Sequence, residues 1–448
     1  MIEKQVDGDK VVVIGIWHLG SVTSACLADL GYRVVGFDPE PERVDTLNRG
    51  VPPLFEPGLE ELFRKNLSTG TLSFTSDLKT ALLGSKYVVV AFDTPVDDRD
   101  EADLSSLYDA ILQSIPYLES DCTIVVSSQV PVGTCEDFAA MIREKRPSLR
   151  FDIAYVPENL RLGQAIERFE RPDMIVIGSN NSRTHKKVEL FYSVIEAPKV
   201  KVDLRTAEMI KHAINSYLAM QVSFINEIAN LCERLGADAV IVGEAMRLDS
   251  RIGSKAMLKP GLGFAGGTLA RDLKTLQKLG QRVGYEMLLV NGILAVNRNQ
   301  NKTIVERLRK LYGSINDLTV GVLGLTYKPG TSTLRRSASL EIIHDLVKEG
   351  AKVRAYDSKA DIHEIHGPIE FENCPDPATT AENADALILV TAWPEFKNLD
   401  FSRIKSLMRR PVIIDAQNTL DAERLVHMGF TYLGVGRTLR VEIGAEGK

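Results

Sequence analysis

The sequence lacks several features, and each absence excludes a class of protein. It contains no run of about 18 consecutive apolar residues, which a membrane-spanning helix would need. The N-terminal segment MIEKQVDGDK holds no apolar core typical of a secretory signal. The five cysteines are scattered without a CxxC pair, which argues against a disulfide framework and against a structural zinc site.

Positive charge is not in excess either. The formal net charge is −6, which disfavours a general nucleic-acid-binding surface. Together these absences predict a cytoplasmic protein with no membrane partner, no nucleic-acid partner and no metal site. What is present is ordinary for a globular chain, with 44% apolar and 25% charged residues. At 448 residues the chain is too long for a single hydrophobic core, so two or three domains are expected.

Short β-branched runs alternate with helical stretches in two parts of the chain. The first part begins with a strand at 10–16 that ends in glycine, then a helical stretch and the strand RVVGFD. This βαβ unit implies a parallel sheet, and the later part repeats the order of its elements. The further expected strands are 86–92, 122–128, 151–156 and 173–179 in the first part, and 318–325, 352–357, 386–391 and 411–416 in the later part.

A long helical segment separates the two parts, because residues 204–236 show helical periodicity without an internal glycine or proline. The expected fold is therefore α/β, with two Rossmann-like parallel-sheet domains joined by a long central helix and an all-α middle domain. The expected domain boundaries are 1–203, 204–314 and 315–448. Ligands of such sheets bind beyond the carboxyl ends of the strands, so two sheets suggest two ligands or one long one.

The turn after the first strand has part of a dinucleotide fingerprint, GxGxxG followed by an acidic residue about 20 residues on. Gly15 and Gly20 keep the first and third glycines, Trp17 replaces the second, and Asp38 ends the next strand. An ordinary tight turn is the alternative. Amide groups at a helix start can hold phosphate whatever the side chain. Asp38 would accept hydrogen bonds from a ribose diol and repel a 2′-phosphate, which favours NAD over NADP, while Arg43 could flank the adenine or bind a phosphate.

A glycine-rich loop, KPGLGFAGGTLARDL, spans residues 259–273. Four glycines lie between Gly261 and Gly267, and a helix is expected to begin near Thr268. Bare glycine backbone can close on phosphate oxygens, so this loop is predicted to cradle a phosphate. Threonine is a good N-cap residue, and Thr268 is expected to cap the helix with its hydroxyl.

Segments along nearly the whole chain match the motifs of one enzyme family. They are FEPGLEELFRKN (55–66), Thr94-Pro95, VPVGT (130–134), PENLRLGQAI (157–166), RPDMIVIG (171–178), the segment 203–238, LDSRIG (248–253) and GLTYKPGTSTLRRSASLEI (324–342). In these segments the chain resembles the UDP-glucose/GDP-mannose 6-dehydrogenases. The resemblance implies an oxidoreductase of polysaccharide or glycoconjugate biosynthesis that uses two NAD to oxidise the C6 hydroxymethyl of a UDP- or GDP-hexose to a carboxylate. It assigns NAD to the first domain, dimerisation to the second and the nucleotide sugar to the third.

The same resemblance implies catalytic roles. Lys211 and Asn215 would polarise and orient the sugar's C6 oxygen, and their i, i+4 spacing places both on one face of the long helix. A lysine there could stabilise oxyanion character, although a lone helical lysine is usually solvated. Glu158 would activate water, with a loop salt bridge as the alternative. Asp272 would cooperate with the lysine, with a contact to the helix dipole as the alternative.

Ligand contacts are also implied by the resemblance. The cofactor residues are Gly15, Trp17, His18, Leu19, Gly20, Asp38, Arg43, Thr94, Pro95, Ser128, Gln129, Arg271 and Arg335. The substrate residues are Glu158, Asn159, Leu160, Arg161, Lys211, Asn215, Arg251, Lys259, Gly263, Phe264, Gly266, Tyr327 and Lys328. Arg251 would reach the sugar bound to a neighbouring subunit, which predicts at least a homodimer.

The chain departs from the family where the catalytic cysteine belongs. The family pattern is roughly GGSCFPKD, whereas AGGTLARD places Thr268 at that position. A threonine hydroxyl is a poor nucleophile without an adjacent base, and no histidine lies nearby in the sequence. Four outcomes stay open: arrest at the aldehyde, oxidation to the acid through a hydrated aldehyde managed by Glu158 and Asp272, oxidation of another carbon, or a non-catalytic nucleotide-sugar-binding regulator. Gln129, Leu162 and Gln417 also depart from the family, which leaves the base and the sugar open.

Overall fold

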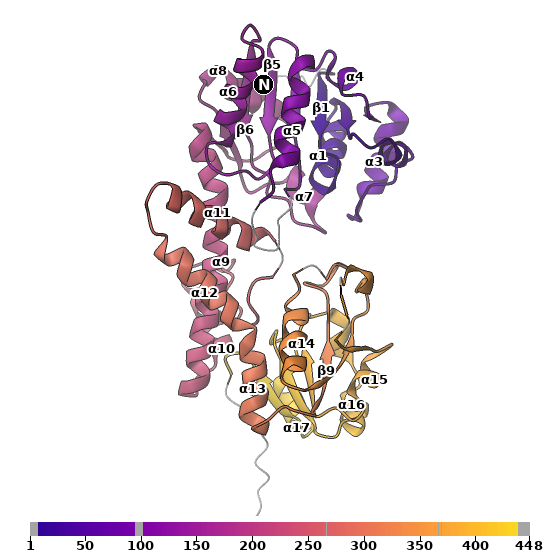
Figure 1. The fold of residues 1–448 in the computed structure, drawn as a ribbon, viewed down its shortest axis with the longest axis vertical. Coiled ribbons are helices and arrows are strands. Elements are labelled where there is room, and N and C mark those ends of the chain that lie inside the picture. The colour runs from indigo at the N-terminus through magenta and orange to yellow at the C-terminus, as the bar shows by residue number, and fades with distance from the viewer. Residues whose placement is uncertain are drawn as a thin grey trace, which may run out of the picture. The chain divides into compact units, whose positions relative to one another are not determined.

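A computed structural model describes residues 8–94, 102–265, 267–334, 336–365, 367–368 and 370–437. The chain divides between Ile214 and Asn215 into two compact units. The long predicted helix is confirmed as α9 (Leu204–Leu235), which runs through this division (Figure 1). The three-domain boundaries stay a prediction. Among the described residues, no helix combines the length and apolarity that crossing a bilayer requires.

The first unit contains an eight-stranded sheet in the order β3-β2-β1-β4-β5-β6-β7-β8. Its strands are β1 Lys10–Ile14, β2 Arg33–Phe37, β3 Leu72–Thr75, β4 Tyr87–Val90, β5 Cys122–Val126, β6 Phe151–Tyr155, β7 Ile175–Gly178 and β8 Lys199–Val202. Its helices are α1 His18–Asp29, α2 Pro41–Asn48, α3 Leu59–Thr69, α4 Leu78–Leu82, α5 Ser105–Ser114, the 3-10 turn η1 Ile115–Tyr117, α6 Thr134–Lys145, α7 Ala165–Glu170 and α8 Ser182–Phe191. Neighbouring strands pair in parallel except β7, which meets β6 antiparallel at Tyr155 and Gly178.

Both faces of this sheet are covered, as a run of continuous apolar strands requires. On β1, Val11 and Val13 pack under α1, α3 and α8, whereas Val12 and Ile14 pack under α5 and α6. All six predicted strands of this part are confirmed as β1, β2, β4, β5, β6 and β7. Two strands that the sequence did not predict, β3 and β8, are short. β8 reads KVKV and lies at the sheet edge, where none of its residues is fully buried, so it carries little apolar signal.

The second unit contains the rest of α9, further helices and a six-stranded sheet in the order β11-β10-β9-β12-β13-β14. The helices before the sheet are α10 Ala239–Leu248, α11 Thr268–Arg282, α12 Leu288–Gln300 and α13 Lys302–Tyr312. The strands are β9 Thr319–Leu323, β10 Lys352–Tyr356, β11 Glu372–Asn373, β12 Ala386–Leu389, β13 Val412–Asp415 and β14 Thr431–Gly434. The remaining helices are α14 Ala338–Lys348, η2 Ile362–Glu364, α15 Pro377–Ala381, η3 Pro394–Asn398, α16 Phe401–Leu407 and α17 Ala422–His427.

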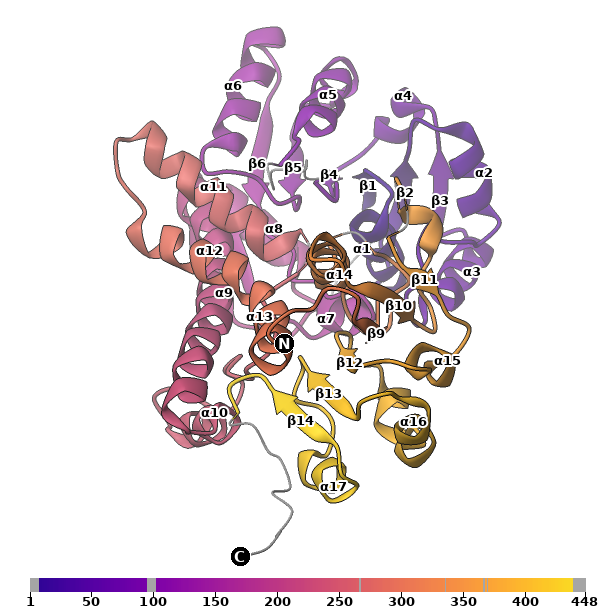
Figure 2. The ribbon, with the colours of Figure 1, turned by 60° about the horizontal axis from the view of Figure 1, so that its bottom comes forward.

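Helices cover this second sheet on both faces as well. Figure 2 shows α14 on one side of the strands and α15 to α17 on the other. The four predicted strands of this part are confirmed as β9, β10, β12 and β13. Six strands of the first sheet, from β3 to β6, and the whole second sheet share the strand order 3-2-1-4-5-6 of dinucleotide-binding folds. The predicted α/β fold with two Rossmann-like sheets and a long central helix is therefore confirmed.

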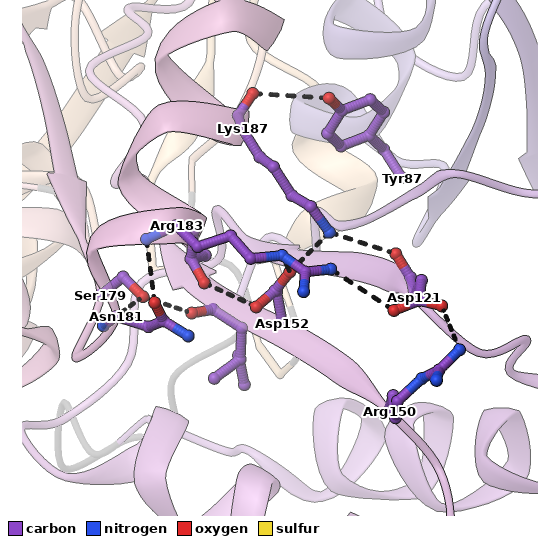
Figure 3. Close-up of polar contacts among 10 residues, drawn as sticks. Tyr87, Asp121, Arg150, Asp152, Ser179, Asn181, Arg183 and Lys187 are labelled. Carbon is purple, nitrogen blue, oxygen red and sulfur yellow. Dashed lines mark hydrogen bonds and ion pairs between the residues drawn. The ribbon is translucent and has the colours of Figure 1, made fainter.

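An ion-pair network lies where β5 and β6 begin, at the edge of the first sheet opposite the carboxyl ends of these strands (Figure 3). The Asp152 carboxylate accepts hydrogen bonds from Lys187 Nζ at 2.6 Å and from Thr184 Oγ1 at 2.8 Å. The Asp121 carboxylate accepts one from Arg150 Nη2 at 2.7 Å. Because Lys187 and Thr184 are on α8, the network fastens that helix to the sheet.

Candidate active site

The first sheet has its topological switch point between β1 and β4, where a ligand of this fold binds. Gly15 ends β1 with a φ of +96°, a backbone conformation that favours glycine. A Cβ on Gly20 would lie 1.9 Å from Gly15 O, so α1 packs against the turn as only glycine permits. These are the roles of the first and third fingerprint glycines. The turn therefore fits a dinucleotide, and the plain-turn alternative does not explain the contact at Gly20.

Trp17, in place of the second glycine, is the N-cap residue of α1 and is exposed. The Arg43 guanidinium lies 5.7 Å from the centre of its ring. Arg43 Nη1 also donates to Asp38 Oδ2 at 2.8 Å, and Asp38 Oδ1 accepts from Glu40 N at 3.0 Å. The carboxylate predicted to bind the ribose is thus already paired with Arg43, which the sequence had placed beside the adenine or a phosphate.

The loops that follow β4 and β5 converge beside this turn. Ser128 Oγ accepts a hydrogen bond from Phe92 N at 2.7 Å, and Thr94 Oγ1 donates to Gln129 O at 3.3 Å. The structure therefore brings together three of the predicted cofactor residues. Sequence reasoning missed Asp93 between them, whose Oδ2 accepts Leu19 N of α1 at 2.9 Å. Three predicted site residues, Pro95, Gly266 and Arg335, lie outside the described residues.

Glu56 is a second residue that sequence reasoning missed, although it lies within the FEPG motif. It is 3% exposed, and its Oε2 lies 2.9 Å from His18 Nε2 at the start of α1. Glu56 also accepts hydrogen bonds from Gly163 N and Ala165 N, each at 2.8 Å. It therefore joins α1 to the end of the PENLRLGQ segment. His18, predicted as a cofactor residue, makes its described contact with this carboxylate.

Lys211 is buried at 5% exposure, so it is not the solvated helix lysine that was the alternative. Its Nζ donates to Glu158 O at 2.5 Å and lies 3.3 Å from Glu158 Oε1. It also lies 3.4 Å from Asn159 Oδ1, and Glu158 Oε2 accepts Leu160 N at 2.7 Å. The lysine thus meets the loop after β6, whose residues 157–161 carry four of the predicted substrate contacts, Arg161 included.

Within the second unit, Asn215 Nδ2 donates to Asp272 Oδ2 at 2.5 Å. Both residues are buried, and Asp272 is 0% exposed on α11. Gly267 occupies the N-cap position of α11 and Thr268 is its first helical residue. The expectation that Thr268 caps this helix is therefore wrong. The helix begins directly after the last glycine, so Thr268 already lies inside it and the N-cap position falls on Gly267. Arg271, at the same helix start, was predicted to contact the cofactor.

The glycine-rich loop is held by side-chain amides that sequence reasoning missed. Asn226 of α9 accepts Gly261 N and donates to Leu262 O, both at 3.0 Å. Asn297 of α12 accepts Phe264 N at 2.7 Å. A Cβ on Gly263 would lie 2.5 Å from Asn297 Oδ1, so glycine is required there. These contacts hold residues 261–264 of the loop between α9 and α12.

Lys259 begins the same loop and is a predicted substrate contact. Burial lowers its pKa, and the Asp415 charge opposes that effect. Lys328, another predicted contact, follows β9 with Nζ 5.6 Å from the Tyr327 ring centre. Arg251 behaves differently, because its side chain is 86% exposed and pairs with Asp249 at 2.7 Å.

In the second sheet, an aspartate carboxylate binds the backbone of the loop that follows the first strand. Asp357 follows β10, the position that Asp38 holds after β2. Its Oδ2 accepts Leu325 N at 2.7 Å, Thr326 N at 3.0 Å and Trp393 Nε1 at 2.9 Å. The two amides lie in the loop after β9, well before α14 begins at Ala338. The Asp357 carboxylate therefore ties this loop to the end of β10 and to Trp393.

No cysteine replaces the one that the family keeps at Thr268. All five cysteines are buried, and burial raises the pKa of each of their thiols. A raised pKa keeps a thiol protonated, whereas the nucleophile is the thiolate. The surroundings of all five are therefore those of buried structural cysteines and not of a reactive thiolate.

Comparison with known proteins covers the chain almost from end to end. Residues 9–196 match the NAD binding domain of the UDP-glucose/GDP-mannose dehydrogenase family, residues 205–299 its central domain and residues 321–422 its UDP binding domain. The UDP-glucose 6-dehydrogenase of Rhizobium meliloti is 38% identical over 436 residues, covering 96% of this chain and 99% of that one. UDP-glucose 6-dehydrogenase TuaD of Bacillus subtilis is 36% identical, covering 96% and 93%.

A solved structure agrees with these matches. The UDP-glucose dehydrogenase of Pyrobaculum islandicum superposes with a TM-score of 0.88 at 32% identity, covering 98% of this chain and 100% of that one. The matched NAD binding domain contains the switch-point turn with Gly15 and Gly20, so sequence match and geometry agree on NAD as the cofactor. The chain therefore belongs to the UDP-glucose/GDP-mannose dehydrogenase family of NAD-dependent nucleotide-sugar dehydrogenases.

Proposed function

We propose that this protein oxidises the C6 hydroxymethyl group of a UDP-hexose, with UDP-glucose as the first candidate. Two relatives named UDP-glucose 6-dehydrogenase, 38% and 36% identical, and the match of residues 321–422 to a UDP binding domain support this substrate. The product would serve polysaccharide or glycoconjugate biosynthesis. The five unpaired cysteines fit a reducing compartment, so the proposed location is the cytoplasm.

The observation that carries the proposal is a buried lysine one helical turn from a buried amide. Lys211 and Asn215 are four residues apart on α9, so both side chains emerge from one face of the helix. The Lys211 ammonium would stabilise negative charge that develops on the C6 oxygen as its proton leaves. Asn215, held by Asp272, would orient that oxygen. NAD supplies the hydride acceptor.

The cofactor would be held at the switch point of the first sheet. Gly15 and Gly20 would allow close approach of the backbone, and amides at the start of α1 would face the phosphates. Asp38 would share its carboxylate between Arg43 and the adenosine ribose. Trp17 and Arg43 would flank the adenine. Ser128, Gln129 and Thr94 fix loops that would lie beside the nicotinamide end.

The extent of oxidation depends on Thr268. The first step removes a hydride and a proton from the alcohol and leaves an aldehyde. A second hydride can leave only after a nucleophile has added to the aldehyde carbon, and no thiolate is placed to add here. We propose that water adds to the aldehyde, that Glu158 and Asp272 handle its protons, and that the resulting hydrate loses the second hydride to give the acid. Arrest at the aldehyde is the competing outcome.

Stoichiometry tests both points. Purified protein with excess NAD and a limiting amount of UDP-glucose should form NADH, read by its absorbance, and uronate, read by mass spectrometry. Two NADH per sugar consumed supports the hydrate route, whereas one NADH per sugar supports arrest at the aldehyde. No NADH with any UDP- or GDP-hexose would overturn the proposed function.

We also propose a homodimer through the second unit. Tyr217, Phe224 and Leu231 recur every seven residues along α9 and are 58%, 44% and 51% exposed. On α10, Ile241 and Leu248 are 60% and 87% exposed at the same spacing. An apolar stripe with a seven-residue repeat is typical of a helix that packs on another helix. Arg251 would then be free to reach a neighbouring sugar, and light scattering on a size-exclusion column should give twice the mass of the monomer.

A further inference from the structure

We infer that the Asp93 carboxylate competes with the pyrophosphate of NAD for the start of α1, and that neutralising it makes the protein bind NAD more tightly. The inference rests on the NAD half of the proposed function and is independent of which sugar is oxidised. In this structure the Asp93 carboxylate binds an amide at the start of α1, where the pyrophosphate of NAD would bind.

The contact bridges the switch point itself. The α1 helix begins at His18, immediately after the turn that ends β1, and its N-cap Trp17 makes no side-chain cap hydrogen bond. Leu19 N, one of the amides that a helix start leaves without a helical acceptor, donates to Asp93 Oδ2 at 2.9 Å. Asp93 follows β4, which pairs in parallel with β1 from Tyr87 to Val90. The carboxylate therefore reaches across the crevice between these strands.

Hydrogen bonds of the neighbouring residues position the main chain that carries Asp93. Ala91 N donates to Ile14 O at 2.9 Å, and Phe92 N donates to Ser128 Oγ at 2.7 Å. Thr94 Oγ1 donates to Gln129 O at 3.3 Å. Asp93 itself is exposed. Its carboxylate can thus turn away into solvent when a ligand arrives, although the main chain that carries it stays in place.

The chemistry is a contest between anions. In this fold the pyrophosphate of a dinucleotide sits on the amides at the start of the first helix. The Asp93 carboxylate uses one of those amides, and its charge repels a pyrophosphate beside it. Because Asp93 is exposed, solvent screens this repulsion, and we expect it to weaken NAD binding by about tenfold, which is 1.4 kcal/mol.

Calorimetric titration of the full chain with NAD, ADP-ribose and adenosine tests the inference. Asp93→Asn keeps the shape and removes the charge, and Asp93→Ala removes the acceptor as well. Asp203→Asn is the matched control, since Asp203 is another exposed helix-start carboxylate, accepting Thr206 N at 2.9 Å, but follows β8 at the sheet edge. Both Asp93 variants should lower the Kd for NAD and ADP-ribose about tenfold, and this gain should shrink with added salt. Adenosine, which has no phosphate, should bind all variants equally.

The inference would be overturned by an unchanged Kd for NAD in both Asp93 variants. An equal increase in affinity for adenosine, or an equal increase in affinity for NAD in Asp203→Asn, would also overturn it. Failure of every protein to bind NAD would overturn it as well. Asp93→Asn should also lower the Tm slightly, because α1 loses a favourable charge at its N-terminus. Stability and affinity would then move in opposite directions, which a general stabilisation cannot produce. If NAD binds as expected but no sugar is oxidised, the proposed function fails while this inference stands.

Discussion

Replacing Lys211 by alanine should lower kcat by about 10² to 10³, with little change in the Kd for NAD. One well-placed donor to a developing oxyanion is worth about 2.7–4 kcal/mol of transition-state stabilisation. Lys211 meets the condition for that magnitude, because it is 5% exposed and its ammonium is not surrounded by water. Removing it also leaves Glu158 without the ammonium 3.3 Å from its carboxylate, which should cost about 1–3 kcal/mol of stability.

The assay separates chemistry from folding. Steady-state NADH formation with UDP-glucose gives kcat and KM, calorimetry gives the Kd for NAD, and thermal unfolding gives stability. Lys187→Ala is the matched control, because that lysine also pairs with a carboxylate, Asp152 at 2.6 Å. This pair lies where β5 and β6 begin, away from the carboxyl ends of these strands. An unchanged kcat in Lys211→Ala would refute the assigned role. An equal loss in Lys187→Ala would show that the effect is structural.

Three further outcomes are expected. Asp152→Asn should lower the stability of the first unit by about 2–4 kcal/mol without changing the Kd for NAD, since the carboxylate is 9% exposed and pairs with Lys187; an unchanged calorimetric Tm would contradict this. Thr268→Cys should raise the rate of uronate formation, because a thiol at a helix start ionises readily, and an unchanged rate would argue against a thioester route at this helix. Burial raises the folded-state pKa of Glu208, so the stability that this group contributes is complete below its unfolded pKa of about 4.3 and is lost as pH rises through the folded pKa. The difference in Tm between the wild type and Glu208→Gln should therefore change with pH over that range. A difference that stays constant with pH would contradict the raised pKa of Glu208.

Glu208 illustrates a kind of contact that no local pattern predicts. It is 0% exposed on α9, and it accepts Gly133 N at 2.6 Å and Cys135 N at 2.9 Å at the start of α6. On the next turn, His212 Nε2 lies 2.9 Å from Val130 O. The partners are more than 70 residues away in sequence. A glutamate and a histidine inside a helical repeat look like surface residues until the fold brings the loop after β5 against them.

The sequence by itself determined the architecture. Apolar runs that end in glycine, such as Val11 to Gly15, have few stable places other than a buried parallel strand, because side chains on both faces must be covered. The absence of glycine and proline inside 204–235 likewise permits one long helix. The family motifs then identified Lys211, Asn215, Glu158 and Asp272 as candidates, since each belongs to a continuous segment.

Only the tertiary structure decided the state of those candidates and the contacts between segments. Burial of Lys211 depends on the loop after β6, and the pairing of Asn215 with Asp272 joins residues on two helices. The start of α11 moved the cap from Thr268 to Gly267, a shift of one residue that local propensity cannot resolve. Asp93 contacts the start of α1 only because β4 pairs with β1 in the folded sheet. Hydrogen bonds and ion pairs act over short distances in space, whereas the groups that they join here are far apart in the sequence. A local sequence pattern therefore does not show which groups meet.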